Sequence, residues 1–357
     1  MKSNFDFLNR YWPALAQIGA TAETYVYSDP NACIYKLGMF AERLVQEILV
    51  FEHIAEPAVE NTHANRIRIL KRAGLLPHEI DNTLYVLRKT RNSAVHIGTD
   101  SVDEAKTLLS LTYNLAVWFM ETYGDWGYIA PEFVMPSETT HEDLESVIAE
   151  QERKIEELTK QLAVVKTAAS GKTQKERARR SESVSAMMNW NEAQTRCLID
   201  EQLRLSGWEA DTQNLRYSKG TRPVKGRNIA ISEWPTNSAF YKNGYADYAF
   251  FVGEKLVALM DAKKMSEDVA STIDVQVKDY AAHIKPEDIP HTVGNWNGYQ
   301  VPFLFASNGR AYLEQLRTKS GIWFLDVREQ ENQPYPIRNW FSPSDLMEKL
   351  GQNTAAA

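Results

Sequence analysis

An aspartate and an Asp-x-Lys triplet stand at corresponding positions of two adjacent apolar segments. Asp247 lies in the first segment, and Asp261 and Lys263 lie at the end of the second. Because side chains alternate along a strand, Asp261 and Lys263 share one face. If residues 253–255 form a three-residue hairpin loop, Asp247 lies opposite Asp261, with Cβ atoms roughly 4.5 to 5.5 Å apart. A two-residue loop would instead turn the two aspartates to opposite faces.

Two carboxylates held this close repel each other unless a cation lies between them. Mg²⁺ accepts such a site, because it binds through one or two carboxylates and keeps several water ligands. An isolated Asp-x-Lys is more often a strand-end ion pair at the rim of a sheet. Here the flanking residues are apolar, and buried charges are costly unless they are paired or bound to metal. The aspartate on the hairpin partner therefore favours a metal site made by Asp247 and Asp261.

A glutamine and a tyrosine follow in the next helical segment. Gln276 lies thirteen residues beyond Lys263, and Tyr280 follows four residues later. A spacing of four places both side chains on one face of a helix. Taken alone, such a pair is usually an ordinary combination of a surface residue and a core residue. Because it follows the acidic residues in this order, the pair is harder to dismiss as an ordinary surface and core combination.

These residues require a mixed sheet with helices around it. Asn191 can cap a helix that ends near Gly207, and residues 268–284 form a second helical segment. Apolar, β-branched and aromatic runs predict four strands, at residues 245–252, 256–262, 301–306 and 322–327. Helices interspersed with strands indicate an α/β sheet domain, which we place at residues 186–350.

The part of the chain before this domain has a different pattern. Residues 1–130 show helical spacing and few strand signals, so we expect an all-α domain. Apolar residues then recur at three and four positions from residue 144 to 165, which predicts a helical spacer or a weak coiled coil. We assign residues 137–185 to this spacer and a basic linker, and residues 351–357 to a disordered tail. The fold class is therefore multidomain, α followed by α/β.

Composition limits the function classes. A net charge of −7 argues against a protein that coats nucleic acid with its whole surface, so any phosphate contact must be local. The two cysteines are too few for a disulfide framework, which favours a reducing compartment. No apolar run is long enough to span a bilayer, and we expect a cytoplasmic protein without membrane contact. The best candidate for local nucleic-acid contact is a basic loop that contains Arg216, Lys219 and Arg222.

The acidic residues and the lysine resemble the active site of the restriction-endonuclease-like, or PD-(D/E)xK, nuclease superfamily. The resemblance implies that Asp247 and Asp261 are catalytic metal ligands for Mg²⁺ and that Lys263 orients or deprotonates the attacking water. It also implies that Gln276 and Tyr280 form the Gln-x₃-Tyr motif of the branch that includes type I restriction subunits, in which the pair contacts DNA or supports the site. The chain departs from the usual pattern in having Asp261 where glutamate is more common, and Ala246 where proline precedes the first acid.

Further tracts are similar to the amino-terminal region of type I restriction motor subunits, and the likeness covers essentially the whole chain. They include residues 191–200, 203–208, 216–220, 233–235, 307–310 and 318–323. The resemblance implies that Glu192 supports the metal and that Asn308 and Arg310 support the site or contact DNA. It implies an endonuclease that cuts double-stranded DNA with methyltransferase and specificity subunits. ATP would be used only by a motor in the full-length parent, and we expect this chain to stop before that motor.

Two alternatives from other classes remain open. The nuclease fold could be vestigial, leaving a docking or DNA-binding module. Alternatively, Arg91, Asn92 and His96 in the helical domain resemble the Arg-x₄-His motif of the HEPN-like superfamily. Active members of that superfamily cleave RNA without metal, using histidine for proton transfer and arginine for charge. A structural polar cluster is the more ordinary interpretation of this motif.

Overall fold

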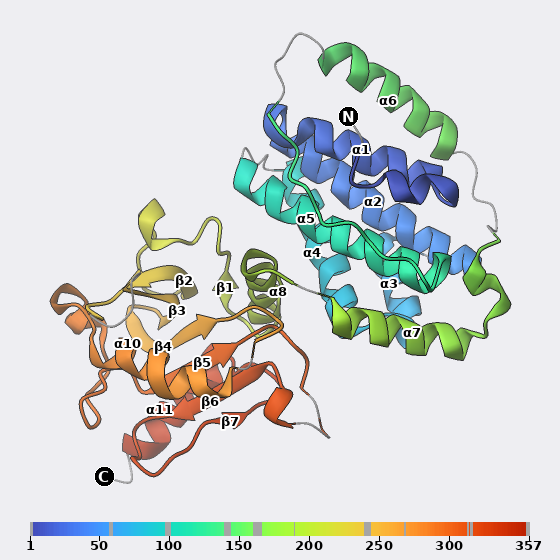
Figure 1. The fold of residues 1–357 in the computed structure, drawn as a ribbon. Helices are drawn as coiled ribbons and strands as arrows, with labels where there is room; N and C mark the ends of the chain where they lie inside the picture. The colour runs from blue at the N-terminus through green and yellow to red at the C-terminus, as the bar shows by residue number, and fades with distance from the viewer. Residues whose placement is uncertain are drawn as a thin grey trace. The chain divides into compact units, whose positions relative to one another are not determined.

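The chain forms two compact units, Met1–Met188 and Asn189–Ala357 (Figure 1). The computed structural model describes residues 3–56, 60–96, 101–138, 144–159, 166–188, 190–238, 244–267, 269–312, 314 and 317–354. Within these residues, the first unit contains helices only and the second contains a seven-stranded mixed sheet. The prediction of a helical region followed by a mixed-sheet domain is therefore confirmed. No helix among the described residues is both long and apolar enough to cross a membrane.

The first unit is built on long helices that bury their apolar faces against each other. The α-helices are α1 (Pro13–Ser28), α2 (Pro30–Phe51), α3 (His63–Arg72), α4 (His78–His96), α5 (Val102–Phe119), α6 (Leu144–Thr159) and α7 (Gln174–Met187). The shorter turns are η1 (Asp6–Arg10), η2 (Met120–Gly124) and η4 (Ala168–Gly171). Asp29 caps α2 by accepting a hydrogen bond from the backbone N–H of Ala32 at 2.9 Å. Gly19 lets the buried ring of Phe5 approach α1, since a Cβ at this position would lie 2.3 Å from that ring.

Two segments that we expected to be spacer and linker are instead parts of the helical unit. Ile155 of α6 is buried, and Glu152 of α6 accepts from the Lys36 ammonium at 2.6 Å. The basic segment forms α7, in which Arg177 is buried and makes a paired contact with Glu52, with Nε–Oε1 at 2.7 Å and Nη2–Oε2 at 2.5 Å. A bidentate pair of this kind compensates the burial of both charges. The linker prediction was wrong because a run of basic residues does not reveal a distant acidic partner.

The second unit carries one sheet in the order β1-β2-β3-β4-β5-β6-β7. The strands are β1 (Glu209–Ala210), β2 (Asn228–Pro235), β3 (Tyr245–Val252), β4 (Lys255–Ala262), β5 (Phe303–Ser307), β6 (Ile322–Asp326) and β7 (Tyr335–Pro336). The β1–β2 and β4–β5 pairs are parallel, and the other neighbouring pairs are antiparallel. The sequence predicted β3 to β6, but we did not recognise β1, β2 or β7.

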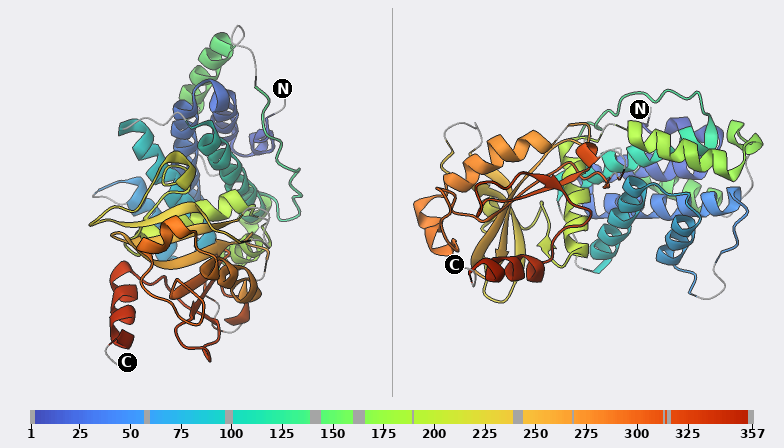
Figure 2. Two further views of the ribbon diagram at one scale, coloured as in Figure 1. Left: turned by 90° about the vertical axis from the view of Figure 1, so that its left-hand side faces the viewer. Right: turned by 90° about the horizontal axis from the view of Figure 1, so that it is seen from below.

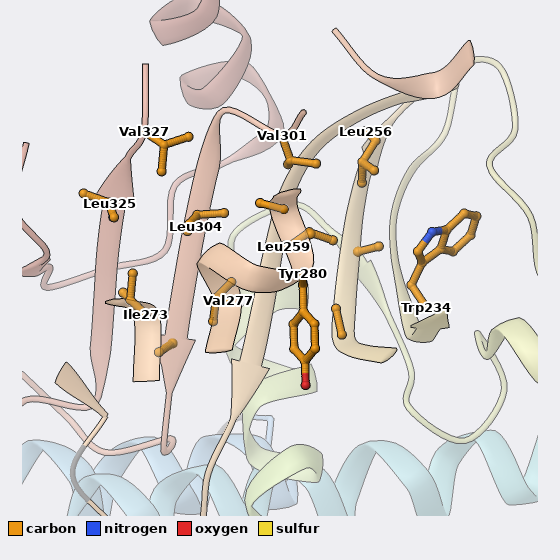
Figure 3. Packing of buried hydrophobic residues seen from close by; sticks show 14 of the residues in the cluster. Trp234, Leu256, Leu259, Ile273, Val277, Tyr280, Val301, Leu304, Leu325 and Val327 are labelled. Carbon is orange, nitrogen blue, oxygen red and sulfur yellow. The ribbon is translucent and has the colours of Figure 1, made fainter. Parts of the chain in front are cut away.

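Helices lie against both faces of this sheet (Figure 2). One hydrophobic cluster joins the sheet to η6 (Ile273–Val277) and α10 (Lys278–Ala282), which follow the short helix α9 (Ala270–Thr272). Figure 3 shows residues of this cluster, among them Leu259, Val277 and Tyr280. The opposite cluster includes residues of α8 (Glu192–Leu205) and α11 (Pro343–Thr354). The remaining short helical turns are η5 (Tyr217–Lys219), η7 (Pro286–His291) and η8 (Arg317–Lys319).

The ends of two helices can be compared with their sequence signals. Asn191 caps α8 as predicted, because its side chain accepts from the N–H of Gln194 at 2.9 Å. Gly207 follows the helix with φ +92°, a conformation that glycine adopts without strain. Helix α11 continues to Thr354, so residues 351–354 are helical and not a disordered tail. Leu346 of α11 is fully buried, and this packing supports the helix. Residues 355–357 lie outside the described part of the chain.

Candidate functional site

The hairpin that carries the acidic residues has the expected register at those residues, but its loop is shorter than expected. Val252 pairs with Lys255, so the loop has two residues, and Gly253 occupies its first position with φ +60°. A two-residue loop alone would turn Asp247 and Asp261 to opposite faces. However, Phe251 pairs with Leu256 and Phe250 with Ala258, which leaves Val257 as an extra residue in β4.

This β-bulge corrects the register by one residue. Val257 and Ala258 both face one hydrophobic cluster, whereas Leu256 and Leu259 face the other. The β3–β4 ladder ends with the pair of Tyr248 and Met260. One residue further in the same register, Asp247 lies opposite Asp261. The prediction of a three-residue loop was wrong, but the bulge places the two aspartates opposite each other. Bulges are often found beside functional sites because they redirect side chains.

The structure brings Asp247, Asp261 and Lys263 together at the end of this hairpin. Both aspartates are buried, with 5% and 3% of their surface exposed. Oδ2 of Asp247 accepts from the N–H of Ala262 at 2.6 Å, which ties β3 to the end of β4. The Lys263 ammonium lies 2.5 Å from Oδ2 of Asp261. The group is held by adjacent strands of a rigid sheet, which favours precise positioning.

Gln276 connects the helical segment to these charges. Its Oε1 accepts from Lys263 Nζ at 2.8 Å, while its Nε2 donates to Asp261 Oδ1 at 2.9 Å and to the Tyr280 hydroxyl at 2.7 Å. A lysine only donates and a carboxylate only accepts, so this amide has one satisfactory orientation. Gln276 lies in a π-helical turn and Tyr280 in the α-helix that follows. Tyr280 is buried, and its hydroxyl is linked to the charged residues through the Gln276 amide.

The electrostatics of the site are those of two interacting acids. Burial raises the pKa of Asp247 to about 7, and the negative charge of Asp261 contributes, although Arg196 opposes the shift. Burial also raises the pKa of Asp261, and the charge of Lys263 opposes that shift. Because burial makes ionisation of both acids unfavourable, an additional positive charge nearby would stabilise their ionised forms. Two carboxylates whose other contacts fix their orientation fit a hard, oxygen-preferring cation such as Mg²⁺. Within the described residues, no group of three or more His, Cys, Asp or Glu side chains forms a larger metal cluster.

Sequence reasoning missed a cation next to Asp247. Arg196 of α8 contacts Oδ1 of Asp247, and its Nη2 also donates to Glu192 Oε1 at 2.6 Å. Glu192, the expected supporting acid, has half of its side chain exposed and reaches Asp247 only through Arg196. The spacing of four between Glu192 and Arg196 was a visible signal of their pairing. The contact with Asp247 was not visible, because 51 residues separate the two in sequence.

The three cations expected in the basic loop have different surroundings. Arg216 is half-buried, and its Nη2 lies 3.4 Å from Glu233 Oε1, so it joins the charges around Arg196. Lys219 and Arg222 are exposed, and the Arg222 guanidinium lies 3.7 Å from the centre of the Tyr217 ring. Exposed cations of this kind can contact a phosphate backbone.

Asn308 and Arg310 form a turn after β5, beside the end of β4. Asn308 is 2% exposed, and its Nδ2 donates to the Glu267 carbonyl at 2.8 Å. Its Oδ1 accepts from the N–H of Arg310 at 3.2 Å. The Asn308 amide therefore holds the turn. The half-buried Arg310 lies in the same turn.

The residues of the Arg-x₄-His motif occupy the end of α4 in the helical unit. Arg91 Nη1 lies 2.5 Å from Glu42 Oε2, and Asn92 is exposed. A Cβ at Gly38 would overlap the Arg91 side chain, which shows how closely Arg91 packs on α2. The side chain of His96 lies outside the described residues. The structure thus gives Arg91 a structural partner and leaves the ribonuclease hypothesis without further support.

A second histidine in this unit, His63, gives a test of pH dependence. It is 7% exposed, and neither ring nitrogen has a hydrogen-bond partner among the described residues. Burial, with the charges of Arg88, Arg91 and Arg66, lowers its pKa from 6.5 to about 4, against the opposing effect of Glu42. Between these pH values, His63 is therefore mostly protonated in the unfolded chain and mostly neutral in the folded chain. Stability is lost as pH falls through this window, by about 3 kcal/mol at pH 4.

We expect His63→Gln to remove most of this acid sensitivity while changing stability little at pH 7.5. Hydrogen exchange at the amides of α3 and α4 in the intact chain measures the opening free energy of this unit at each pH. His78→Gln is the matched control, because His78 already has a partner in Asn82 at 3.1 Å. Equal acid sensitivity in wild type and His63→Gln would contradict the prediction.

Fold and site together define a two-unit protein whose α/β unit holds a buried cluster of paired acids, lysine and arginine. Residues 209–350 match the sequence model described as the second domain of the type I restriction enzyme EcoKI endonuclease subunit. The chain is 29% identical over 424 aligned positions to the type I restriction enzyme EcoKI endonuclease subunit of Escherichia coli strain K12. That alignment covers 98% of this chain and 36% of the relative. No solved structure matches the chain.

The chain is therefore similar, over nearly its whole length, to part of a type I restriction enzyme endonuclease subunit. It spans about a third of the length of that relative. The family resemblance inferred from the sequence is confirmed.

Proposed function

We propose that the second unit is a Mg²⁺-dependent endodeoxyribonuclease of the restriction-endonuclease-like type. The observation that carries this proposal is the convergence of Asp247, Asp261 and Lys263 on one face of a bulged hairpin, with Gln276 bridging the lysine and an acid. The relation to a restriction endonuclease subunit supports the same activity. The substrate would be double-stranded DNA, and the reaction hydrolysis of a phosphodiester bond.

Asp247 and Asp261 would hold the metal through carboxylate oxygens. A bound Mg²⁺ supplies Lewis-acid polarisation of the phosphate and lowers the pKa of water. The N–H of Ala262 and the amide of Gln276 orient the two carboxylates from behind.

Lys263 would position the attacking water. An ammonium has three donor hydrogens, and the contacts to Asp261 and Gln276 use two of them. The third is available to a water molecule at the exposed side of the lysine, a quarter of whose side chain is accessible. A lysine that pairs with a buried acid and is partly accessible to solvent is suited to position a water molecule.

DNA would be held by the exposed cations of the basic loop, Lys219 and Arg222, together with Arg216 and Arg310 near the sheet end. These residues contribute charge without reading base sequence. We propose that sequence choice comes from methyltransferase and specificity subunits in a type I complex.

The test is a cleavage assay with the purified chain, supercoiled DNA and Mg²⁺ or Mn²⁺. We expect slow nicking without sequence preference, lost in Asp261→Asn. Asp274→Asn is the matched control, since Asp274 is an exposed acid two residues from Gln276 that pairs with Lys278. Equal behaviour of wild type and Asp261→Asn would instead favour a docking module.

A further inference from the structure

Arg196 is a buried cation surrounded by carboxylates from three different elements. Only 13% of its side chain is exposed. Its Nη2 contacts Asp247 of β3 and lies 2.6 Å from Glu192 Oε1 of α8, and its Nη1 lies 3.8 Å from Glu233 Oε1 of β2. The guanidinium therefore neutralises Asp247 from one side while two further acids lie within its reach.

A hydrogen-bond donor or a cation of the protein itself lies beside each carboxylate oxygen of the two aspartates. Asp247 uses Oδ1 for Arg196 and Oδ2 for the N–H of Ala262. Asp261 uses Oδ1 for Gln276 and Oδ2 for Lys263. Each aspartate is thus balanced by one internal cation. Because like charges repel strongly at short range, a guanidinium in contact with Asp247 opposes any second cation at that carboxylate.

The Glu233 carboxylate lies within reach of Arg196, and the Glu233 backbone has a strained conformation. It lies within β2 at φ +53°, in the left-handed region that residues other than glycine rarely adopt. The β2–β3 ladder pairs Ser232 with Tyr248 and Trp234 with Ala246, but the intervening Glu233 and Asp247 are not paired. Strain of this kind persists where the surrounding structure enforces it, and it is concentrated at functional sites. Glu233 also lies 3.4 Å from Arg216, which holds its carboxylate near Arg196.

We propose that Arg196 is a positioning residue that holds the acidic pair in a state of low affinity for divalent cations. Oδ1 of Asp247 becomes available as a ligand when the guanidinium shifts from Asp247 onto Glu192 and Glu233. The inference rests on the proposed function, because it assumes that Asp247 and Asp261 bind a divalent cation. It adds that α8 and β2 set the affinity of a site whose ligands lie on β3 and β4.

The test compares Mn²⁺ binding by the intact chain and its variants, without DNA, from the electron paramagnetic resonance signal of the free ion. We expect Arg196→Gln to bind Mn²⁺ about tenfold more tightly than wild type, which corresponds to about 1.4 kcal/mol. Without metal, the same variant should melt at a lower temperature than wild type, since Asp247 loses its counter-charge, and added Mn²⁺ should reverse the difference. Arg227→Gln is the matched control, since Arg227 is an exposed cation of the same unit that pairs with Glu209 at the surface. Its Mn²⁺ affinity should stay within about twofold of wild type.

A second variant tests the same idea in the opposite direction and does not require removal of the buried arginine. Glu233→Gln removes one acid that would receive Arg196, so we expect Mn²⁺ to bind several-fold more weakly. The inference is overturned if wild type binds Mn²⁺ in an Asp261-dependent manner but Arg196→Gln binds no more tightly. If Asp261→Asn leaves Mn²⁺ binding unchanged, the proposed metal site itself is wrong and the inference is overturned with it.

Discussion

Lys263→Ala is expected to reduce metal-dependent DNA nicking by about 10³-fold, within the range found for positioned proton-transfer groups. The lysine contributes no ligand to the proposed metal, so Mn²⁺ binding by this variant should remain at least as tight as in wild type. Asp261→Asn, in contrast, should lose both binding and nicking. The pair of variants therefore separates the residue that positions water from a residue that holds metal.

The measurements are nicking rates on supercoiled DNA at saturating Mn²⁺, and Mn²⁺ affinity without DNA. Nicking is best measured at pH 8. The charge of Lys263 opposes the effect of burial on the pKa of Asp261, so the pKa should be higher in Lys263→Ala, and a higher pH keeps the acid ionised. Lys278→Ala is a suitable control, since Lys278 pairs with the exposed Asp274 on the surface of the same helical segment. Nicking by Lys263→Ala at the wild-type rate would show that the lysine is only the counter-ion of Asp261.

Gly321→Ala is expected to destabilise the second unit by more than about 3 kcal/mol, the range of severe steric overlap in a packed structure. A Cβ at Gly321 would lie 2.1 Å from the carbonyl oxygen of Arg310 and 2.4 Å from its nitrogen. Both atoms belong to the backbone, so no side-chain rotation relieves the overlap. The Gly321 carbonyl also accepts from the N–H of Asn308 at 3.1 Å, which fixes the turn beside the end of β4.

Urea denaturation of the intact chain, followed by tryptophan fluorescence, gives the loss of stability, because Trp323 lies two residues from the substitution. Gly351→Ala in α11 is the control, since a Cβ there meets nothing within 4 Å. Alanine is the better helix former, so that variant should be unchanged or slightly more stable. A Gly321→Ala protein as stable as wild type would mean that the two backbone segments separate without cost.

Local sequence signals predicted the elements that carry the site. The apolar runs around Asp247 and Asp261 matched β3 and β4, and the cap at Asn191 and the glycine at 207 marked the ends of α8. These features depend on side-chain alternation and on hydrogen bonds between near neighbours, so they are visible without knowledge of the fold. The spacing between Gln276 and Tyr280 likewise predicted a shared helical face, and the two side chains are hydrogen-bonded.

Other features depend on residues far apart in the chain. Strand β2 was missed because its apolar pattern is short and follows a loop rich in glycine, proline and arginine. The helix α7 was taken for a linker because its buried Arg177 is compensated by Glu52, 125 residues earlier. Neither partner can be inferred from the local composition around the other.

By itself, the sequence determined which residues could do chemistry, their order, the two strands that present them and the family to which the chain is related. The tertiary structure decided the register and the charge balance. A single extra residue at Val257 turns Asp261 and Lys263 to the side of Asp247, because packing on both faces of the sheet selects the bulge over the regular ladder. Arg196 and Glu233 meet Asp247 only when α8, β2 and β3 are assembled, since charges interact through distance in space and not through separation along the chain.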